Sequence, residues 1–352
     1  SSFATEVLKR LIAIPSVSRS EDQSATFLEN VLKEKGIPVQ RIGNNVWASG
    51  RLFNASMPTL LLNSHHDTVP PNSGYTHDPL KPFVKDGKIF GLGSNDAGGP
   101  LVSLLAVFLN FFEKELPFNM VFAASAEEEV SGKNGMELLL KHLPRIDMGI
   151  VGEPTQMNMA IAEKGLLVLD ARAKGTSGHA ARDDGDNALY KAMDDINLIR
   201  DFTFDRSSEL LGPVHLAVTS IETKNKSHNV IPDECSFVVD VRVNEKYSFD
   251  EILHILGSNI KSEIAPRSLR LKPSFIPADH PLVRAGIQCG MNTFGSATLS
   301  DMALMSFPAV KLGPGDSLRS HTPDEFIFIR EIEEAIAKYI QLVENLIQNL
   351  KK

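Results

Sequence analysis

The sequence predicts an α/β protein in which a doubly wound, mostly parallel sheet is interrupted by a second, smaller α+β domain. Two observations lead to this prediction. Short apolar runs alternate with amphipathic segments in the first part of the chain and again near its C-terminus, as strands and helices do when a parallel sheet is covered on both faces. Between residues 166 and 275 the order of strand and helix signals changes, and segments rich in glycine and proline flank this stretch.

The larger domain is expected to combine amphipathic helices with short buried strands. Apolar residues recur with helical spacing in four segments, namely 1–14, 20–35, 100–115 and 328–350. Gly36 ends the second of these helices, and Pro117 follows the third. Continuous apolar runs predict buried strands at 59–62, 119–125, 148–151 and 309–312.

The middle of the chain predicts a separate small domain. Its expected elements are a strand at 166–173, a helix at 186–201, strands at 214–221 and 235–243, a helix at 249–264 and a strand at 269–275. This β-α-β-β-α-β order is that of ferredoxin-like domains. We therefore predict a discontinuous domain of residues 1–165 and 276–352, with residues 166–275 inserted into it.

Composition and charge argue for a globular protein and against several classes of binding partner. The chain of 352 residues is 42% hydrophobic and 23% charged, which is typical of a globular protein with well-buried cores. Its net charge of -8 argues against nucleic acid or an anionic membrane as the main partner. The longest apolar stretch, 100–112, is too short to span a bilayer, and residues 1–14 lack the pattern of a signal peptide. With only Cys235 and Cys289, far apart, a reducing cytoplasmic setting is expected.

Residues that commonly bind metals follow each predicted strand of the larger domain. His65 and Asp67 end the first apolar run, and Glu127, Glu128 and Glu129 follow the second. Glu153 follows the third run, and His321 follows the fourth after a Gly-Pro-Gly turn. Because open α/β sheets place their sites at the carboxyl ends of the strands, these side chains are expected to line one pocket.

Each of these signals also has a structural interpretation. His65 and Asp67 lie two apart on an extended segment and point the same way, so Asp67 can orient His65, but the pair could also be a polar turn. Asp96, in a glycine-rich loop before the 100–115 helix, can bridge two cations or simply cap that helix. The three glutamates could form a solvated acidic turn. Their shared placement at strand ends favours the metal interpretation.

Five segments, in chain order, resemble motifs of the M20 family of metallopeptidases and deacylases. They are His65-His66-Asp67-Thr68-Val69-Pro70, Gly93-Ser94-Asn95-Asp96, Glu127-Glu128-Glu129, Gly152-Glu153-Pro154-Thr155 and Ser320-His321-Thr322-Pro323-Asp324-Glu325. The resemblance covers nearly the whole chain and implies a zinc-peptidase-like catalytic domain with an inserted dimerisation and lid domain. It also implies two zinc ions, for which cobalt can substitute: one held by His65, Asp96 and Glu153, the other by Asp96, Glu129 and His321. Glu128 would be the general base, and Asp67 would steady His65.

The inserted domain resembles the family at three further residues. His179, in a glycine-histidine turn, would reach the active site of a neighbouring subunit in a homodimer and help to hold the oxyanion, although it could also be a loop histidine in solvent. Asn229 and Arg242 resemble residues that bind a substrate carboxylate, for which a guanidinium is well suited. Arg242 could equally serve in a structural salt bridge.

The resemblance implies a linear-amide hydrolase that acts on a small N-acyl amino acid. Within the family, the Thr68-Val69-Pro70 and Gly152-Glu153-Pro154-Thr155 segments favour N2-acetylornithine, as in arginine biosynthesis. A succinyl-diaminopimelate or succinylornithine desuccinylase is the next interpretation, and a dipeptidase is the third. A non-catalytic, metal-bound regulatory or binding protein is the alternative from another class.

Overall fold

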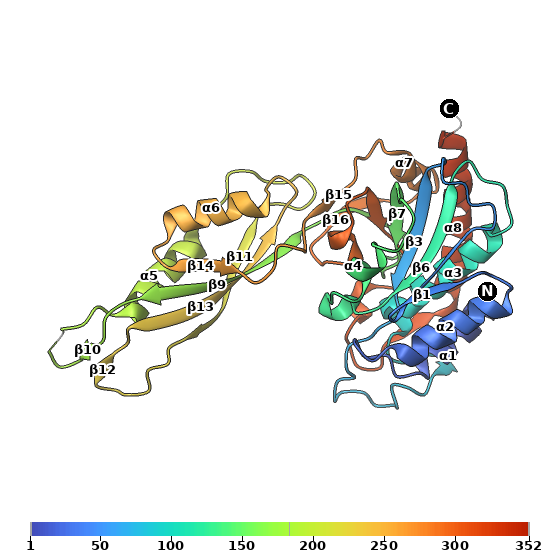
Figure 1. Ribbon diagram of the computed structural model, residues 1–352. Helices are drawn as coiled ribbons and strands as arrows, with labels where there is room; N and C mark the ends of the chain where they lie inside the picture. The colour runs from blue at the N-terminus through green and yellow to red at the C-terminus, as the bar shows by residue number, and fades with distance from the viewer. Residues whose placement is uncertain (1, 183, 351–352) are drawn as a thin grey trace. The chain divides into compact units, whose positions relative to one another are not determined.

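The computed structural model describes residues 2–182 and 184–350 (Figure 1). The chain divides into two compact units. The first comprises Ser1–Ile161, Phe275–Phe294 and Ser300–Lys352, and the second comprises Ala162–Ser274 and Gly295–Leu299. Residues 162–165 and 295–299, which the sequence assigns to the larger domain, thus belong with the second unit. The backbone approach there is close, since a Cβ on Gly295 would lie 2.3 Å from the carbonyl oxygen of Leu210.

The first unit is built around one large sheet, and this confirms the predicted α/β class. In spatial order its strands are β1 (Gln40–Ile42), β2 (Asn45–Ser49), β6 (Asn119–Ser125), β3 (Thr59–His65), β7 (Met148–Val151), β17 (Ala309–Lys311), β8 (Met159–Glu163) and β15 (Ser274–Phe275), with β16 (Thr293–Ser296) paired to β8. The four central strands, β6, β3, β7 and β17, are mutually parallel. Their carboxyl ends therefore meet along a single edge of the sheet.

Helices cover both faces of this sheet because its central strands are apolar on both sides. The helices of the unit are α1 (Ser2–Ile12), α2 (Asp22–Glu34), α3 (Gly99–Phe111), α4 (Met136–Leu139), α7 (Pro281–Gln288) and α8 (Ile329–Leu350). Helices α1, α3 and α8 pack together, and α3 lies against β3 and β6 (Figure 1). Leu61 of β3 packs with α4, whereas Leu60 and Leu62 alternate to the opposite face, and all three are fully buried.

A second, three-stranded sheet lies next to the loop that carries Asp96. It runs in the order β18 (Phe326–Phe328), β5 (Lys88–Phe90) and β4 (Phe83–Lys85), with antiparallel pairing throughout. Ile327 is fully buried, and a Cβ on Gly99 at the start of α3 would lie 2.2 Å from its Cδ1. Gly99 is therefore required for the close approach of β18 to α3.

The second unit has the predicted ferredoxin-like order. Its elements are β9 (Gly165–Lys174), α5 (Ala188–Asp201), β11 (His215–Glu222), β13 (Glu234–Val243), α6 (Phe249–Asn259) and β14 (Glu263–Pro266). The strands form an antiparallel sheet in the order β11-β13-β9-β14. Alternate residues of β9 and β13 are buried in one core with both helices, as expected for a sheet covered on one face. A two-stranded ribbon, β10 (Gly178–His179) and β12 (Val230–Ile231), extends from this unit (Figure 1).

The last part of this unit differs from the expectation of a helix at 249–264 and a strand at 269–275. Helix α6 ends at Asn259, because the backbone N–H groups of Lys261 and Ser262 donate to the buried carboxylate of Asp195, at 3.0 and 2.7 Å. The final strand is therefore β14, which pairs with β9. This contact between distant segments gives no periodic signal in the sequence.

Among the helices of the described residues, none combines the length and the apolar character needed to cross a membrane.

Candidate metal centre

The four parallel strands deliver ligand-type side chains to one edge of the first unit. His65 is the last residue of β3, Glu128 and Glu129 lie in the short helix η2 (Glu128–Val130) after β6, and Glu153 follows β7 by two residues. His321 follows β17 and the helical turn η4 (Ser317–Arg319). Asp96 comes from the helical turn η1 (Ser94–Gly98) that precedes α3.

His65 presents one ring nitrogen to the cluster. Its side chain is 1% exposed, and its Nδ1 lies 3.0 Å from the backbone oxygen of Asp67 and 3.4 Å from the Asp67 Oδ1. An N–H at Nδ1 therefore donates to Asp67, which leaves Nε2 free to act as a metal ligand. His66 points the other way, with Nδ1 2.9 Å from the Ser24 hydroxyl and Nε2 2.8 Å from the Asn44 carbonyl oxygen.

Asp67 connects His65 to the loop that carries the glutamates. Its carboxylate accepts hydrogen bonds from the Ser18 hydroxyl at 2.7 Å and from the backbone N–H groups of Glu128 and Glu129, both at 3.1 Å. Burial alone would raise the pKa of Asp67, but the hydrogen bond from His65 and its charge, together with Ser18, lower this pKa to about 2. Asp67 is therefore a fixed anion that orients one imidazole and one loop at the same time.

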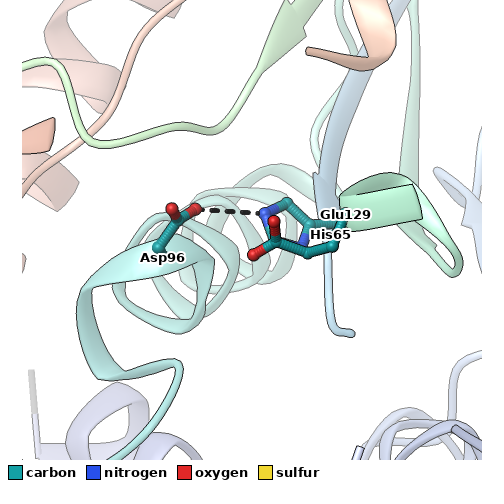
Figure 2. Close-up of side chains that lie close together, drawn as sticks. All are labelled: His65, Asp96 and Glu129. Atoms are coloured by element: carbon teal, nitrogen blue, oxygen red, sulfur yellow. Dashed lines mark hydrogen bonds and ion pairs between the residues drawn. The ribbon is translucent and has the colours of Figure 1, made fainter. Parts of the chain in front are cut away.

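Asp96 lies between the two imidazoles. Its Oδ1 is 3.2 Å from Nε2 of His65, and its Oδ2 is 3.6 Å from Nε2 of His321. Figure 2 shows the carboxylate of Asp96 facing the ring of His65, with Glu129 beside them. Each oxygen of this carboxylate thus faces a different imidazole, which is the arrangement that a bridging ligand requires.

The remaining carboxylates surround the two imidazoles, and Glu129 also offers an oxygen within 4.8 Å of ligand atoms of His65 and Asp96. Both oxygens of Glu129 lie within 3.1 Å of Nε2 of His321. On the other side, Glu153 Oε1 and Glu128 Oε2 lie 3.8 and 4.0 Å from Nε2 of His65. His321 is 52% exposed whereas His65 is 1% exposed, so the cluster is open on the His321 side.

The charges of this cluster fit a cation. Four carboxylates (Asp96, Glu128, Glu129 and Glu153) surround two imidazoles, and Lys311 interacts electrostatically with Glu153. Even if both imidazoles and Lys311 are counted as positive, the four carboxylates outnumber these cations. A fifth carboxylate, that of Asp67, contacts His65 and the backbone of Glu128 and Glu129. Buried carboxylates in excess of cations are costly unless a further positive charge is present. Imidazole nitrogens and carboxylate oxygens are also the donors that suit zinc, cobalt and similar divalent ions.

The pKa values of the metal-free protein also reflect the close packing of these carboxylates and imidazoles. Burial raises the pKa values of Glu128 and Glu153 well above their usual range, and this outweighs the attraction of His65. For His65 itself, burial lowers the pKa, but the hydrogen bonds to Asp67 and Asp96 outweigh burial and raise it. The hydrogen bond to Glu129 raises the pKa of His321 to about 9.

Two buried acids next to this cluster carried no predicted role. Asp301, at the start of η3 (Asp301–Leu304), accepts hydrogen bonds from the Ser125 hydroxyl at 2.6 Å and from the Asn63 amide at 2.9 Å. Burial raises the pKa of Asp301 to about 6. Glu325, which is 2% exposed, accepts hydrogen bonds from backbone N–H groups of the Asp96 loop. Glu325 could have been found from the sequence, because it ends the 320–325 segment that contains His321 and resembles a family motif. Asp301 follows no predicted strand.

The three candidate residues of the second unit fall into two places. His179 is paired with Val230 in the β10–β12 ribbon, and the N–H of Ala180 donates to the carbonyl oxygen of Asn229 at 3.0 Å, so His179 and Asn229 are neighbours. Arg242 lies near the opposite end of the sheet and donates to Asp240 at 2.8 and 3.2 Å. In β13, Glu234 pairs with Lys174 at the end of β9, whereas Arg242 pairs with Leu166 near its start. At the rise per residue of an extended strand, Glu234 and Arg242 are roughly 26 Å apart. One copy of this unit therefore does not bring Arg242 together with His179 and Asn229.

Comparison with known proteins agrees with this geometry. The sequence profile of peptidase family M20/M25/M40 matches residues 61–348. The chain belongs to this M20 family. It is therefore a metal-dependent amidohydrolase, as the sequence predicted.

The similar curated proteins include two desuccinylases. The succinyl-diaminopimelate desuccinylase of Wolbachia pipientis wMel is 25% identical over 370 residues, covering 97% of this chain and 92% of that protein. The succinyl-diaminopimelate desuccinylase of Buchnera aphidicola (strain Tuc7) is 28% identical over 274 residues, covering 72% of this chain and 73% of that protein.

Solved structures share the fold over nearly their whole length. A tripeptidase of Staphylococcus aureus superposes with a TM-score of 0.77 at 20% identity, covering 98% of each chain. A dinuclear metal-binding M20 peptidase of Bacillus subtilis superposes with a TM-score of 0.74 at 15% identity, covering 99% of this chain and 98% of that one.

We predict that metal binding releases protons and becomes tighter as the pH rises towards about 9, the pKa of His321 in the metal-free protein. The raised pKa values of Glu128, Glu153, His65 and His321 mean that these groups retain protons in the metal-free protein, and a cation must displace them. Calorimetric titration of metal-free protein in two buffers with different ionisation enthalpies measures the number of protons released. A binding enthalpy that is the same in both buffers would contradict this prediction.

Proposed function

We propose that this M20 enzyme hydrolyses the amide bond of an N-acyl amino acid with two zinc ions bound at the carboxyl edge of β6, β3, β7 and β17. The observation that carries the proposal is the position of the Asp96 carboxylate between two imidazoles, where two sets of ligands can form. His65 and Glu153 complete one set, and His321 and Glu129 complete the other. Cobalt suits the same nitrogen and oxygen donors.

Glu128 and Asp67 have different roles next to the metals. When bound, the two metal ions would polarise the scissile carbonyl and lower the pKa of a water molecule. Glu128 would take a proton from this water, and the resulting hydroxide would attack the carbonyl carbon. Glu128 would then return the proton to the amine that leaves as the C–N bond breaks. Asp67 keeps His65 in the tautomer that exposes Nε2, and its bonds to two backbone N–H groups hold the Glu128 loop in place.

We predict that Glu128→Gln keeps both metals but loses at least about a hundredfold in kcat, the typical contribution of a general base. The amide has nearly the shape of the carboxylate, but it cannot accept the proton. Glu127→Gln is the matched control, because the carboxylate of Glu127 faces Asn134 instead of the cluster. Metal content by elemental analysis and turnover of each variant test the assignment. Undiminished turnover of Glu128→Gln would refute it.

The substrate class rests on the resemblance and on the similar proteins. The motifs of the sequence favour N2-acetylornithine, whereas the similar curated proteins of Wolbachia and Buchnera are named succinyl-diaminopimelate desuccinylases. Both substrates contain a small acyl group on the amine of a diamino acid that also has a free carboxylate. We therefore propose an acylated diamino acid as the substrate, with desuccinylation and deacetylation as the two candidate reactions.

A substrate panel separates these reactions. We expect kcat/KM for either N2-acetylornithine or a succinylated diamino acid to exceed that for a plain dipeptide by at least about a hundredfold, or 2.7 kcal/mol of transition-state discrimination. The panel contains N2-acetylornithine, succinylornithine, succinyl-diaminopimelate and a dipeptide, and amine release is measured with metal-loaded protein. Preference for the dipeptide would replace the proposed substrate class. Absence of hydrolysis with both metals bound would refute the proposed activity.

A homodimer completes the proposed site. His179 and Asn229 lie at one end of the second unit and Arg242 at the other, so two copies of this unit could supply both sets of groups to one substrate. Strand β11 is an edge strand with exposed residues over its last half, and helix α5 exposes Tyr190 (65%) and Met193 (47%). An unpaired strand edge next to exposed apolar side chains supports association through this unit.

Mixing two inactive variants tests this proposal. If His179 acts in the site of the partner, a heterodimer of His179→Ala and Glu128→Gln contains one complete site. Statistical mixing in equal amounts makes about half of the dimers heterodimers with one of two sites intact, so about a quarter of wild-type activity should return. Activity is assayed after co-refolding, and each variant alone is the control. Failure to regain activity in a sample shown to contain heterodimers would contradict action across subunits.

The proposed setting is the cytoplasm. Cys235 and Cys289 are both free thiols, as is usual in a reducing compartment.

A further inference from the structure

The buried carboxylate of Glu325 gathers the backbone of the Asp96 loop. Its Oε2 accepts a hydrogen bond from the N–H of Gly93 at 3.0 Å. Its Oε1 accepts from the N–H groups of Asn95 at 2.7 Å and Asp96 at 2.9 Å. Three donors from four consecutive residues thus converge on one side chain that is 2% exposed.

The loop depends on an outside acceptor because its backbone is not helical. Gly93 has a φ of 73°, and Asp96 has φ and ψ of −121° and 97°. In these conformations the N–H groups do not enter a helical ladder, and a buried N–H without a partner is costly. The two oxygens of the Glu325 carboxyl group can satisfy all three donors. Burial and the charge of Asp96 raise the pKa of Glu325 to about 8, and the hydrogen bonds from the loop oppose this rise.

The backbone of Glu325 and of the next residue is itself anchored to the 90–91 segment. The N–H of Gly91 donates to the carbonyl oxygen of Glu325 at 2.9 Å. The next residue, Phe326, begins β18 and pairs with Phe90 of β5. Since His321 lies four residues before Glu325, the same short segment carries an imidazole of the cluster and the carboxylate that shapes the Asp96 loop.

Asn95 makes a second connection between these segments. Its side chain is fully buried, donates to the carbonyl oxygen of Asp316 at 3.0 Å and accepts from the N–H of Asp316 at 3.0 Å. The residue before Asp96 is therefore tied to the turn that precedes His321. With Glu325 following His321, the Asp96 loop is attached to the His321 segment on both sides of the imidazole.

We propose that Glu325 is a positioning residue that fixes the carboxylate of Asp96 relative to His321 and thereby sets the affinity of the metal pair. This inference rests on the proposed function, in which Asp96 and His321 are metal ligands. Glu325 does not contact the substrate in this account. It acts by orienting a ligand, as the partners of metal-bound side chains commonly do.

The test compares Glu325→Gln and Glu325→Asp with the full-length wild-type protein. In Glu325→Gln one acceptor oxygen is replaced by a donor that opposes the N–H groups of the loop. In Glu325→Asp the carboxyl group remains, but on a shorter side chain. Asp195→Asn is the matched control, because Asp195 is also a buried carboxylate with two backbone N–H donors, but it belongs to the second unit.

Zinc affinity is measured by competition with a chromophoric chelator, and ligand geometry by the visible absorption spectrum of the cobalt-substituted protein. For Glu325→Gln we expect the affinity for at least one ion to fall about 10- to 100-fold, with an altered cobalt spectrum. Glu325→Asp should show a smaller loss. Asp195→Asn should lower the melting temperature while zinc affinity and the cobalt spectrum remain those of the wild type.

The outcomes are distinguishable. Wild-type zinc affinity and cobalt spectrum in Glu325→Gln, even with a lower melting temperature, would show a purely structural role and overturn the inference. If Glu325→Gln does not fold, Glu325→Asp decides in the same way. An equal loss of zinc affinity in Asp195→Asn would also overturn the inference, because the effect would then follow general stability. If the wild-type protein itself binds no metal pair, the proposed function fails, and it fails independently of Glu325.

Discussion

The parallel pairing of β6, β3, β7 and β17 determines where the candidate site of this protein can form. Parallel strands point their carboxyl ends to one edge, so residues that are distant in the sequence become neighbours there. Such strands are buried on both faces and are therefore mainly apolar. The polar groups of the site therefore begin where the strands end, at His65 and in the segments after Ser125 and Val151.

This arrangement concentrates negative charge where little water can screen it. Asp96, Glu128, Glu129 and Glu153 are each at most 15% exposed, and they share two imidazoles. The protein tolerates this crowding by fixing the surrounding anions with hydrogen bonds, as Asp67 is fixed by Ser18 and two backbone N–H groups. Stability and function are thus linked, because a bound cation relieves the repulsion that the fold creates.

The candidate site was predictable where a local motif marks it. Each ligand-type residue follows an apolar run or a glycine-rich turn, so its placement could be inferred from the pattern of the chain. The supporting contacts were not predictable in this way. Asp301 bonds to Asn63 and Ser125, and Glu325 bonds to Gly93, Asn95 and Asp96, all across large sequence separations. The early end of α6 has the same cause, since the carboxylate of Asp195 comes from another helix.

Local patterns in the sequence were sufficient to predict the α/β class, the β-α-β-β-α-β order of the inserted segment and the residues that gather at the strand ends. These follow from local periodicity and strand polarity, which are properties of neighbouring residues. The three-dimensional structure was needed to establish that each oxygen of Asp96 faces a different imidazole and that Arg242 is remote from His179 and Asn229 within one unit. Such relations depend on strand register and on how irregular loops are anchored, and both are set by contacts between segments far apart in the chain.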